Sequence, residues 1–518
     1  KIGKFMKNSA LAVLLLVFGY GQSLAQAGDN AKPNILLFMV DDMGWQDTSV
    51  PFFNETTPLN RRYHTPNMER LAKKGMKFTN AYATPLCSPT RVSLLTGMNA
   101  ARHRVTNWTH MVRDNSTDAK DDVFEPVSWN LNGFSPVEGI PGTVYGTPLP
   151  QLLKEAGYYT IHVGKAHWGS MGTPGANPTN LGFLVNIAGH AAGHPQSYQG
   201  SQNYGSMPGK TTYHAVPGLQ EYYGSEVFLS EALTLEAMKA LEQPVKEKKP
   251  FFLYMAHYAV HTPIQADARY YGKYLEAGLD SIEARYASLV EGMDKSLGDL
   301  LDYLERNDLE KNTVVIFMSD NGGLSLVPPR GGQLHTHNLP LKAGKGSMHE
   351  GGIREPMLVS WPGVTKAGST CGQYVVIEDF FPTLLEIGSA TGRKPLQSVD
   401  GSSFVRYLRK PERRDESRSL VWHFPNKWTG GGGPGINYSS AIRKGSWKLI
   451  YSMKDQKLSL YNLADDIGEE RDLAGTNTAK RDELARELTA KLKGWNAQMP
   501  VYRSTGAAAK WPDEISSR

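Results

Sequence analysis

Two short apolar runs, almost 280 positions apart, constrain the fold of this chain most strongly. Residues 34–40 read NILLFMV and residues 313–318 read TVVIFM, and neither run is interrupted by a charged side chain. Continuous apolar runs of this length are typical of strands that are buried on both faces, as in a parallel sheet. Runs of helical spacing, such as 149–156 and 281–306, alternate with further strand-like runs. We therefore expect an α/β fold with a large central, mostly parallel sheet sandwiched by helices.

Oxygen-bearing side chains follow both runs directly. They are Asp41, Asp42, Asp320 and Asn321. The carboxyl ends of parallel strands meet at one edge of a sheet, so these four side chains can converge. Together they predict a site for a hard cation, Ca²⁺ first and Mg²⁺ second. The alternative for the adjacent pair is a solvated loop or a helix cap, because two neighbouring carboxylates repel each other unless a cation lies between them.

One of the two cysteines lies in the stretch CSPTRVSLLTG, residues 87–97. Pro89 suits the first turn of a helix, which places Cys87 at or just before a helix N-terminus. Free backbone N–H groups and the helix dipole favour an anion there. Arg91 adds a permanently charged donor one turn later. The alternative for Cys87 is a small buried hydrophobic residue.

This stretch resembles the signature of the type I, formylglycine-dependent sulfatases, an arylsulfatase-like family of the alkaline phosphatase superfamily. The matching elements are Cys-x-Pro-x-Arg and the Leu95-Thr96-Gly97 ending. The resemblance implies that a formylglycine-generating or sulfatase-maturating enzyme oxidises Cys87. The hydrated aldehyde is then the nucleophile, and residue 87 is also a ligand of the cation.

Three further elements match the same family. Gly-Lys-x-His supplies Lys165 and His167, His-Thr-Pro supplies His261, and Gly-Lys-Gly followed by Glu-Gly-Gly-Ile-Arg-x-Pro supplies Lys345. The resemblance implies catalytic roles for these residues and for Arg91, with Lys165, His261 and Lys345 binding substrate and His167 accepting a proton. From the residues alone, Lys165 and His167 would be ordinary surface residues or, in an extended segment, neighbours pointing the same way.

Several other polar residues have no role assigned by the resemblance. His190 and His194 would suit zinc only on a helix, and the Gly and Pro around them predict a substrate-facing loop instead. Candidates for substrate contact are Arg330, His335, His423 and Asn426. His257 has no family counterpart. The loop-rich segment 102–146 is interpreted as surface excursions near the pocket.

The first 27 residues have the pattern of a secretory signal peptide. Three lysines precede an apolar run at 10–18 that is too short to span a bilayer, and small residues follow at cleavage spacing. We expect an exported protein, periplasmic or secreted, with no membrane span. The remaining chain is predicted to comprise a catalytic domain at 28–405 and a C-terminal subdomain at 406–518, the latter an antiparallel sheet with one helix.

The charge balance argues against nucleic acid as a partner. The whole chain has 56 basic and 51 acidic side chains, and three of the lysines lie in the predicted signal peptide. The motifs instead predict a sulfatase that hydrolyses sulfate monoesters, with O-sulfated sugars of glycans as the expected substrates. Two alternatives are a phosphate or phosphonate monoester hydrolase of the same superfamily, and a secreted glycan-binding protein that has lost catalysis.

Overall fold

The first apolar run forms the strand at the centre of the main sheet. The computed structural model describes residues 32–210 and 212–515, and within them the sheet has nine strands. Eight follow the order β11-β2-β10-β9-β1-β8-β6-β7, and β12 pairs with β2. The strands are β1 (Asn34–Val40), β2 (Met76–Tyr82), β6 (Tyr159–Gly164), β7 (Val185–Ile187), β8 (Phe251–Ala256), β9 (Thr313–Ser319), β10 (Arg354–Ser360), β11 (Ser369–Cys371) and β12 (Val375–Val376).

Most strand pairs of this sheet are parallel, as predicted. Strands β7, β6, β8, β1 and β9 run in one direction, whereas β10 is antiparallel to both of its neighbours. In the register of β1 with β9, Val40 lies opposite Ser319. The residues that follow these two strands therefore leave the same edge of the sheet side by side.

Helices cover both faces of the sheet because successive β1 side chains point to opposite faces. Ile35, Leu37 and Met39 belong to one hydrophobic core, whereas Leu36, Phe38 and Val40 belong to the other. The first core includes residues of α3 (Cys87–Thr96), α5 (Leu149–Glu155) and α10 (Phe380–Ile387). The second includes residues of α2 (Pro66–Lys74), α6 (Leu229–Lys246) and α8 (Ser281–Arg306). Each fully buried apolar side chain contributes about 1.5–3 kcal/mol, so the unbroken run is explained by burial on both sides.

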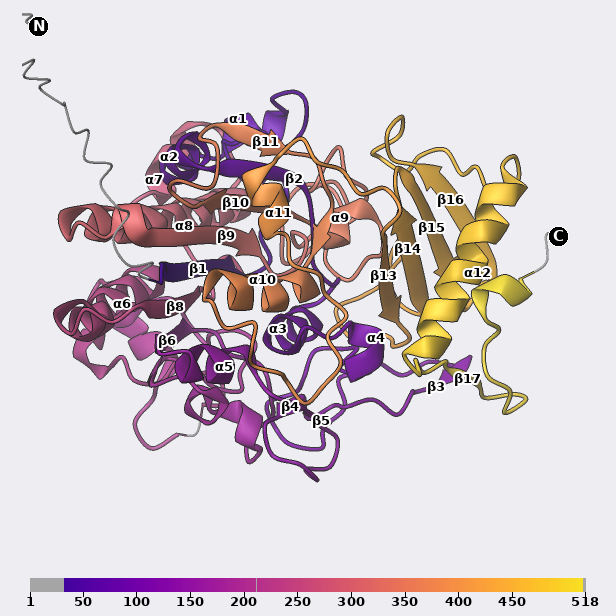
Figure 1. Cartoon of the computed structure of the whole chain (residues 1–518), viewed down its shortest axis with the longest axis horizontal. Coiled ribbons are helices and arrows are strands. Elements are labelled where there is room, and N and C mark those ends of the chain that lie inside the picture. Colours follow the sequence, from indigo (N-terminus) through magenta and orange to yellow (C-terminus); the bar gives the residue numbers. More distant parts are fainter. Residues whose placement is uncertain (1–31, 211, 516–518) are drawn as a thin grey trace, which may run out of the picture. The chain divides into compact units, whose positions relative to one another are not determined.

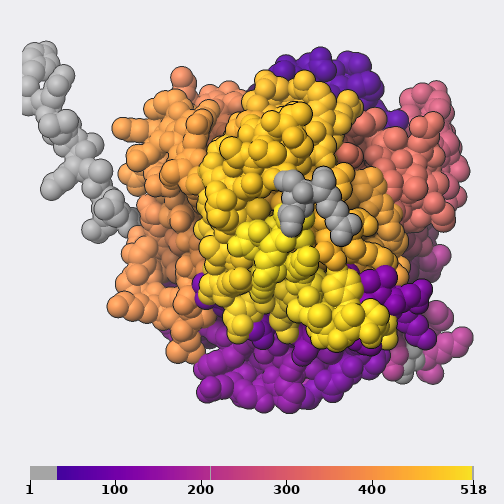
Figure 2. Space-filling model, turned by 90° about the vertical axis from the view of Figure 1, so that its right-hand side faces the viewer, coloured from indigo at the N-terminus to yellow at the C-terminus, as the bar shows by residue number. Residues whose placement is uncertain are grey.

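A second, four-stranded antiparallel sheet follows the central sheet along the chain, with a long helix packed along it (Figure 1). Its elements are β13 (Ser419–Phe424), β14 (Ser439–Lys444), β15 (Trp447–Ser452), β16 (Lys457–Asn462) and α12 (Thr478–Gly494). The predicted fold class is thus confirmed. Figure 2 shows this C-terminal segment spread over one end of the molecule, where its yellow surface meets violet surface from the first third of the chain. Pairing of β17 (Val501–Tyr502) with β3 (Phe124–Glu125) joins the C-terminal segment to this earlier part of the chain.

A buried ionic network fixes the second sheet to the first. Lys448 of β15 is fully buried, and its Nζ lies 2.7 Å from Glu350 and 2.9 Å from Glu469. Arg354 also pairs with Glu350, at 3.1 Å. The network joins residues that are about a hundred positions apart.

The remaining short elements connect these layers. They are α1 (Pro58–Arg62), α4 (Ala100–His103), β4 (Phe134–Ser135), β5 (Val144–Tyr145), α7 (Tyr271–Glu276), α9 (Glu350–Ile353) and α11 (Val405–Arg409). No helix among the described residues is long and apolar enough to cross a membrane. The predicted signal peptide at 1–27 lies outside the described residues, and the predicted domain boundary at 405/406 stays a prediction.

Candidate active site

Cys87 is the first residue of α3, as its position before Pro89 predicted. Leu86 is the N-cap and supplies no side-chain hydrogen bond, and Gly97 ends the helix with a φ of 68°. The whole helix is buried, and Cys87 is 3% exposed. Burial raises the pKa of the Cys87 thiol above its usual value, with Lys165 and Lys345 opposing the shift. The unmodified side chain is therefore a neutral thiol, not a thiolate nucleophile.

The four predicted metal ligands meet at the ends of β1 and β9. Asn321 Nδ2 donates to Asp42 Oδ1 at 2.8 Å, and the backbone N–H of Asp42 donates to Asp320 Oδ1 at 3.3 Å. None of these residues is more than 2% exposed. The oxygens Asp41 Oδ1 and Asn321 Oδ1 are buried and have no hydrogen-bond partner among the described residues. Buried oxygens left without a donor are what a hard-cation site requires, so these residues fit Ca²⁺ or Mg²⁺.

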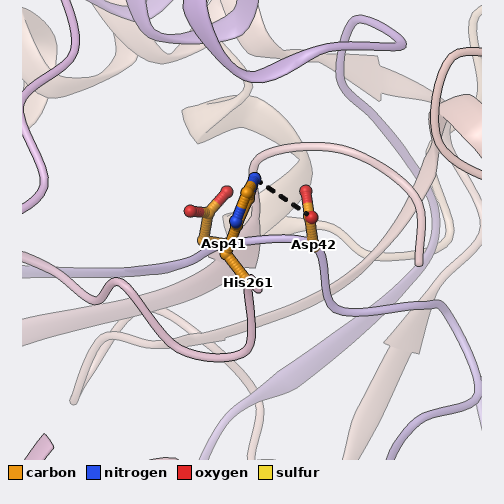
Figure 3. A group of neighbouring side chains, drawn as sticks. All are labelled: Asp41, Asp42 and His261. Atoms are coloured by element: carbon orange, nitrogen blue, oxygen red, sulfur yellow. Dashed lines mark ion pairs between the residues drawn. The ribbon is translucent and has the colours of Figure 1, made fainter. Parts of the chain in front are cut away.

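His261 lies against the same carboxylates. Its Nε2 is 3.5 Å from Asp42 Oδ2, and its side chain lies between Asp41 and Asp42 (Figure 3). Ligand atoms of these three residues lie within 4.8 Å of one another, a grouping able to hold a metal ion. On its other side, His261 Nδ1 is 2.9 Å from the carbonyl oxygen of Thr262.

Three buried cations face the carboxylates. The pairs are Lys165 with Asp41 at 2.6 Å, Lys345 with Asp42 at 2.6 Å, and Arg91 with Asp320 at 2.8 Å. Buried charges persist only where they are paired, so each cation offsets part of the cost of burying its carboxylate. The three pairs draw together residues from five separate segments of the chain.

The pKa values of the two adjacent carboxyl groups, Asp41 and Asp42, shift in opposite directions. Burial and then the charge of Asp320 raise the pKa of Asp41 well above its usual value. Burial would also raise the pKa of Asp42, but His261 and Lys345 hold it below the usual range. Asp41 is therefore the carboxylate that most needs additional positive charge.

His167 has its tautomer set by a backbone carbonyl. Its Nε2 lies 2.8 Å from the carbonyl oxygen of Thr109, which can only accept a hydrogen bond, so Nε2 carries the proton. Nδ1 keeps its lone pair and lies 3.4 Å from Cys87 Sγ. Burial, with Lys165 next, lowers the pKa of His167 well below its usual value, so the ring is neutral. The geometry leaves a proton acceptor beside residue 87.

Lys165 and His167 both reach the site, but the segment that carries them is not extended. Strand β6 ends at Gly164, and His167 adopts a φ of 56°. The alternation argument from an extended backbone was therefore wrong for this pair. The left-handed backbone conformation at His167 bends the segment after the strand, so that Lys165 reaches the carboxylates and His167 reaches Cys87.

Cys87, His167, His261 and Lys345 open onto one pocket of about 290 Å³. Its outer walls come from segments to which the sequence assigned no chemistry. They include Trp108, Thr109, His110 and Met111, together with Trp428, Thr429 and Gly430. The prediction of surface excursions for 102–146 was thus partly wrong: Val105 and Asn107 are fully buried and Thr109 is 1% exposed. The spacing of these residues in the sequence does not indicate that they line a pocket, because tertiary contacts hold the loop in place.

A stack of histidines forms another wall of the pocket. The ring centroids of His194 and His214 lie 3.9 Å apart, and those of His194 and His261 lie 5.6 Å apart. His194 Nδ1 lies 3.0 Å from the carbonyl oxygen of Pro195, which leaves its Nε2 as a hydrogen-bond acceptor. His194 therefore lies on a pocket-lining loop, as predicted. His190 is not among the lining residues, and its backbone carbonyl accepts from the N–H of His167 at 3.2 Å.

Five predicted or unassigned polar residues lie elsewhere. Arg330 is 1% exposed, pairs with Glu283 at 2.7 Å and lies over the ring of Tyr286, so its prediction as a substrate contact was wrong. His335 does not line the pocket. The others are held in protein contacts: His257 by Ser296, His423 by Ser440 and the Gln498 carbonyl, and Asn426 by Asp118. These contacts hold one side of each of the three side chains, whereas His257 Nδ1 and Asn426 Oδ1 are buried without a hydrogen-bond partner among the described residues.

Buried carboxylates and buried cations around one side chain at a helix N-terminus suit hydrolysis of an ester of a tetrahedral oxyanion. Comparison with known proteins identifies the family. The sulfatase family model matches residues 33–390, and the model described as N-sulphoglucosamine sulphohydrolase, C-terminal, matches 343–498. The chain belongs to the sulfatase family of the alkaline phosphatase superfamily and is a sulfuric ester hydrolase.

Individual relatives agree with this assignment. The chain is 31% identical to a sulfatase of Formosa agariphila, over 90% of this chain and 89% of that protein. It is 30% identical to N-acetylgalactosamine-6-sulfatase of Homo sapiens, over 92% and 88% of the two chains. The structure of Ps i-CgsB in complex with k-i-k-neocarrahexaose is similar with a TM-score of 0.68 and 28% identity, covering 90% of this chain and 94% of that one.

Proposed function

We propose that this protein hydrolyses sulfate monoesters of sugars, with residue 87 converted to formylglycine and a Ca²⁺-type cation bound beside it. The observation that carries the proposal is the position of Cys87, at a helix N-terminus and 3.4 Å from the unprotonated nitrogen of His167. A formylglycine at this position would supply a hydrated aldehyde whose oxygen attacks sulfur. A thiol with a raised pKa has no comparable reactivity, which is consistent with a need for modification.

The cation would be held by Asp41, Asp42, Asp320 and Asn321, together with residue 87. The unpartnered oxygens of Asp41 and Asn321 support this assignment. A hard cation there supplies positive charge that orients the nucleophilic oxygen and stabilises the negative charge of the sulfate. Ca²⁺ is preferred to Mg²⁺ because it accepts several carboxylate ligands and irregular geometry.

Side chains around the pocket would carry out the remaining steps of the reaction. Lys165, beside Asp41, holds the nucleophilic oxygen, Arg91 stabilises the charged cluster, and Asp320 is a candidate acceptor for the proton released on attack. His261 and Lys345 flank Asp42, where they would bind the sulfate and assist departure of the alcohol. Asp42 raises the pKa of Lys345 against the effect of burial, so this lysine stays charged. His167 then accepts the proton of the remaining hydroxyl of residue 87, which breaks the bond from residue 87 to the sulfate, releases the sulfate and restores the aldehyde.

The walls of the pocket support a sugar as the alcohol. The indoles of Trp108 and Trp428 offer apolar faces, whereas His194 and His110 offer nitrogen atoms for hydroxyl groups. The names of the relatives point the same way, since one is an N-acetylgalactosamine-6-sulfatase and another was solved in complex with k-i-k-neocarrahexaose. We further propose an exported enzyme, periplasmic or secreted, that requires a sulfatase-maturating enzyme as its partner.

Release of inorganic sulfate from defined sugars tests the proposal. Purified protein, coexpressed with a maturating enzyme, is assayed on 6-O-sulfated N-acetylgalactosamine, 6-O-sulfated glucosamine, sulfated galactose and the matching phosphate esters. Mass spectrometry of the peptide containing residue 87 establishes whether the cysteine has been modified, and Cys87→Ala serves as the inactive control. Preferential phosphate release would favour the phosphoester hydrolase, whereas sugar binding without turnover by modified protein would favour the glycan-binding alternative.

A further inference from the structure

A second cavity lies where the C-terminal sheet meets the edge of the central sheet. Its volume is about 260 Å³, near the lower end of small-molecule sites, which begin at about 300 Å³. One wall comes from Asn80 of β2, Arg354 of β10 and residues 372–374. The other comes from Arg443, Gly445, Ser446, Leu463, Ala464 and Ile467. Arg414 and Glu416, from the segment between the two sheets, complete it.

Three guanidinium groups line this cavity. Arg354 and Arg443 are only 6% and 7% exposed, whereas Arg414 is exposed at the rim. Arg354 lies over the indole of Trp45 and Arg443 lies against the ring of Tyr374, at 4.4 Å and 4.9 Å. These contacts fix the planes of both buried guanidinium groups.

Each arginine keeps its Nη2 atom for a ligand. Arg354 donates through Nε to the Thr79 carbonyl and through Nη1 to Glu350. Arg443 donates through Nε to the Gly445 carbonyl and through Nη1 to Asn80 and Tyr82. Arg414 donates only through Nη1, to backbone carbonyls. Within the described residues, Nη2 of all three has no hydrogen-bond partner.

The buried charges around the cavity do not balance. Two buried carboxylates, Glu350 and Glu469, face three buried cations, Lys448, Arg354 and Arg443. Both carboxylates contact Lys448, and Arg443 forms no ion pair with any carboxylate in the described part of the chain. At the rim, Arg414 and Glu416 both line the cavity, and no ion pair joins them among the described residues. Glu350 attracts Arg443 without touching it, but these buried charges still sum to one excess positive charge, which favours a bound anion.

We propose that this cavity is a second oxyanion site, which binds a sulfate group through the Nη2 atoms of Arg354, Arg414 and Arg443. A guanidinium matches the spacing of two oxyanion oxygens, and three of them can surround a tetrahedral anion. The site lies apart from the pocket of Cys87, since the two cavities share no lining residue. The sulfate group is either free inorganic sulfate or an ester on a second unit of a sulfated glycan.

Selenate, a tetrahedral isostere of sulfate, locates the site directly. Crystals of the full chain are soaked in low-millimolar selenate, and an anomalous peak is expected within hydrogen-bond distance of all three arginines. In solution, titration calorimetry with inorganic sulfate on the Cys87→Ala protein should detect this site in addition to any binding at the pocket. Arg414→Gln, at an exposed position, should weaken binding at this site about tenfold or more, because one charge-assisted hydrogen bond is lost. Glu416→Gln, the matched control, should strengthen it.

Two outcomes would overturn the proposal. They are a selenate peak at the active-site pocket with none between the arginines, and sulfate binding that neither Arg414→Gln nor Glu416→Gln changes. Neither result depends on enzyme activity, so failure here is distinguishable from failure of the proposed function. Comparison of KM for a sulfated oligosaccharide and for its monosaccharide then distinguishes the two possible ligands, a glycan sulfate ester and free sulfate. If the glycan is the ligand, Arg414→Gln raises KM for the oligosaccharide alone; if free sulfate is the ligand, both values stay unchanged.

Discussion

Nδ1 of His167 lies 3.4 Å from Sγ of Cys87, and the Thr109 carbonyl holds the opposite side of the ring at 2.8 Å. This relationship places a neutral imidazole with its lone pair directed at the proposed nucleophile. It also assigns a role to the loop that follows α4, because the backbone carbonyl of Thr109 determines which ring nitrogen of His167 is unprotonated.

Replacement of His167 tests that relationship. We expect His167→Asn to lower kcat on a sulfate ester by roughly 100- to 10,000-fold, the usual contribution of a positioned acid or base, with a smaller change in KM. Steady-state kinetics on modified protein provides the measurement. His335→Asn is the matched control, since His335 does not line the pocket and should leave kcat unchanged. Full activity of His167→Asn would remove this residue from the mechanism.

Removal of divalent cations should inactivate the enzyme and lower its thermal stability. The unpartnered oxygens of Asp41 and Asn321 lose their proposed partner when a chelator removes the ion. A ligand present at 100 times its Kd stabilises the folded state by about 2.7 kcal/mol, so the change in Tm is measurable by calorimetry. Added Ca²⁺ should restore both activity and Tm. Unchanged activity and Tm after exhaustive chelation would contradict a cation at these residues.

The pocket walls should matter for sugars more than for small esters. Trp428→Ala is expected to raise KM for a sulfated sugar by about tenfold, because a buried aromatic contact of 1–2 kcal/mol is lost. An aryl sulfate that fills only the inner pocket should be hydrolysed nearly as before. Kinetics on the two substrates gives the comparison, and equal effects on both would argue that Trp428 supports the fold and not the sugar.

The ionic network between the two sheets should be essential for stability. Lys448→Met leaves Glu350 and Glu469 buried without their shared cation, and we expect a loss of about 3–5 kcal/mol in the free energy of unfolding. Lys457→Met on the neighbouring strand is the control. Lys457 is 65% exposed in its pair with Asp472, so its removal should cost less than about 1 kcal/mol. Denaturant unfolding measures both, and similar values for the two variants would refute the argument.

Stability should fall as the pH rises from about 4.5 to about 8, because of one buried carboxyl group. Burial, and next the charge of Asp379, raise the pKa of Glu378 from 4.5 to about 8. The folded state holds this proton more tightly than the unfolded state, so its contribution is complete below pH 4.5 and is lost as pH rises through 8. Glu378→Gln should reduce the change in the free energy of unfolding over this pH range by a few kcal/mol at most. Unfolding at pH 5 and pH 8 checks this, with the exposed Glu412→Gln as control.

Much of the fold was predictable from local pattern. An apolar run such as residues 34–40 can be stable only between two covered faces, and Pro89 can be accommodated in a helix only near its start. These constraints act over a few residues, so the sequence displays them directly. The positions of the carboxylates after two such strands followed from the same reasoning, given a parallel sheet.

Other parts of the site depended on contacts that no local pattern encodes. The sequence suggested Arg330 as a substrate contact, yet its side chain is buried against Glu283 and Tyr286, which lie far from it in the sequence. His194 meets His214 and His261 only because three loops cover the same edge of the sheet.

The sequence alone therefore determined the sheet, its helical layers and the chemical type of the site, because burial and backbone geometry restrict residues one turn or one strand at a time. The tertiary structure alone decided the tautomer of His167, the walls of the pocket and the balance of charge around Arg443. Each of these depends on atoms brought within a few ångströms by chain closure, and electrostatic and hydrogen-bond energies are set by those distances.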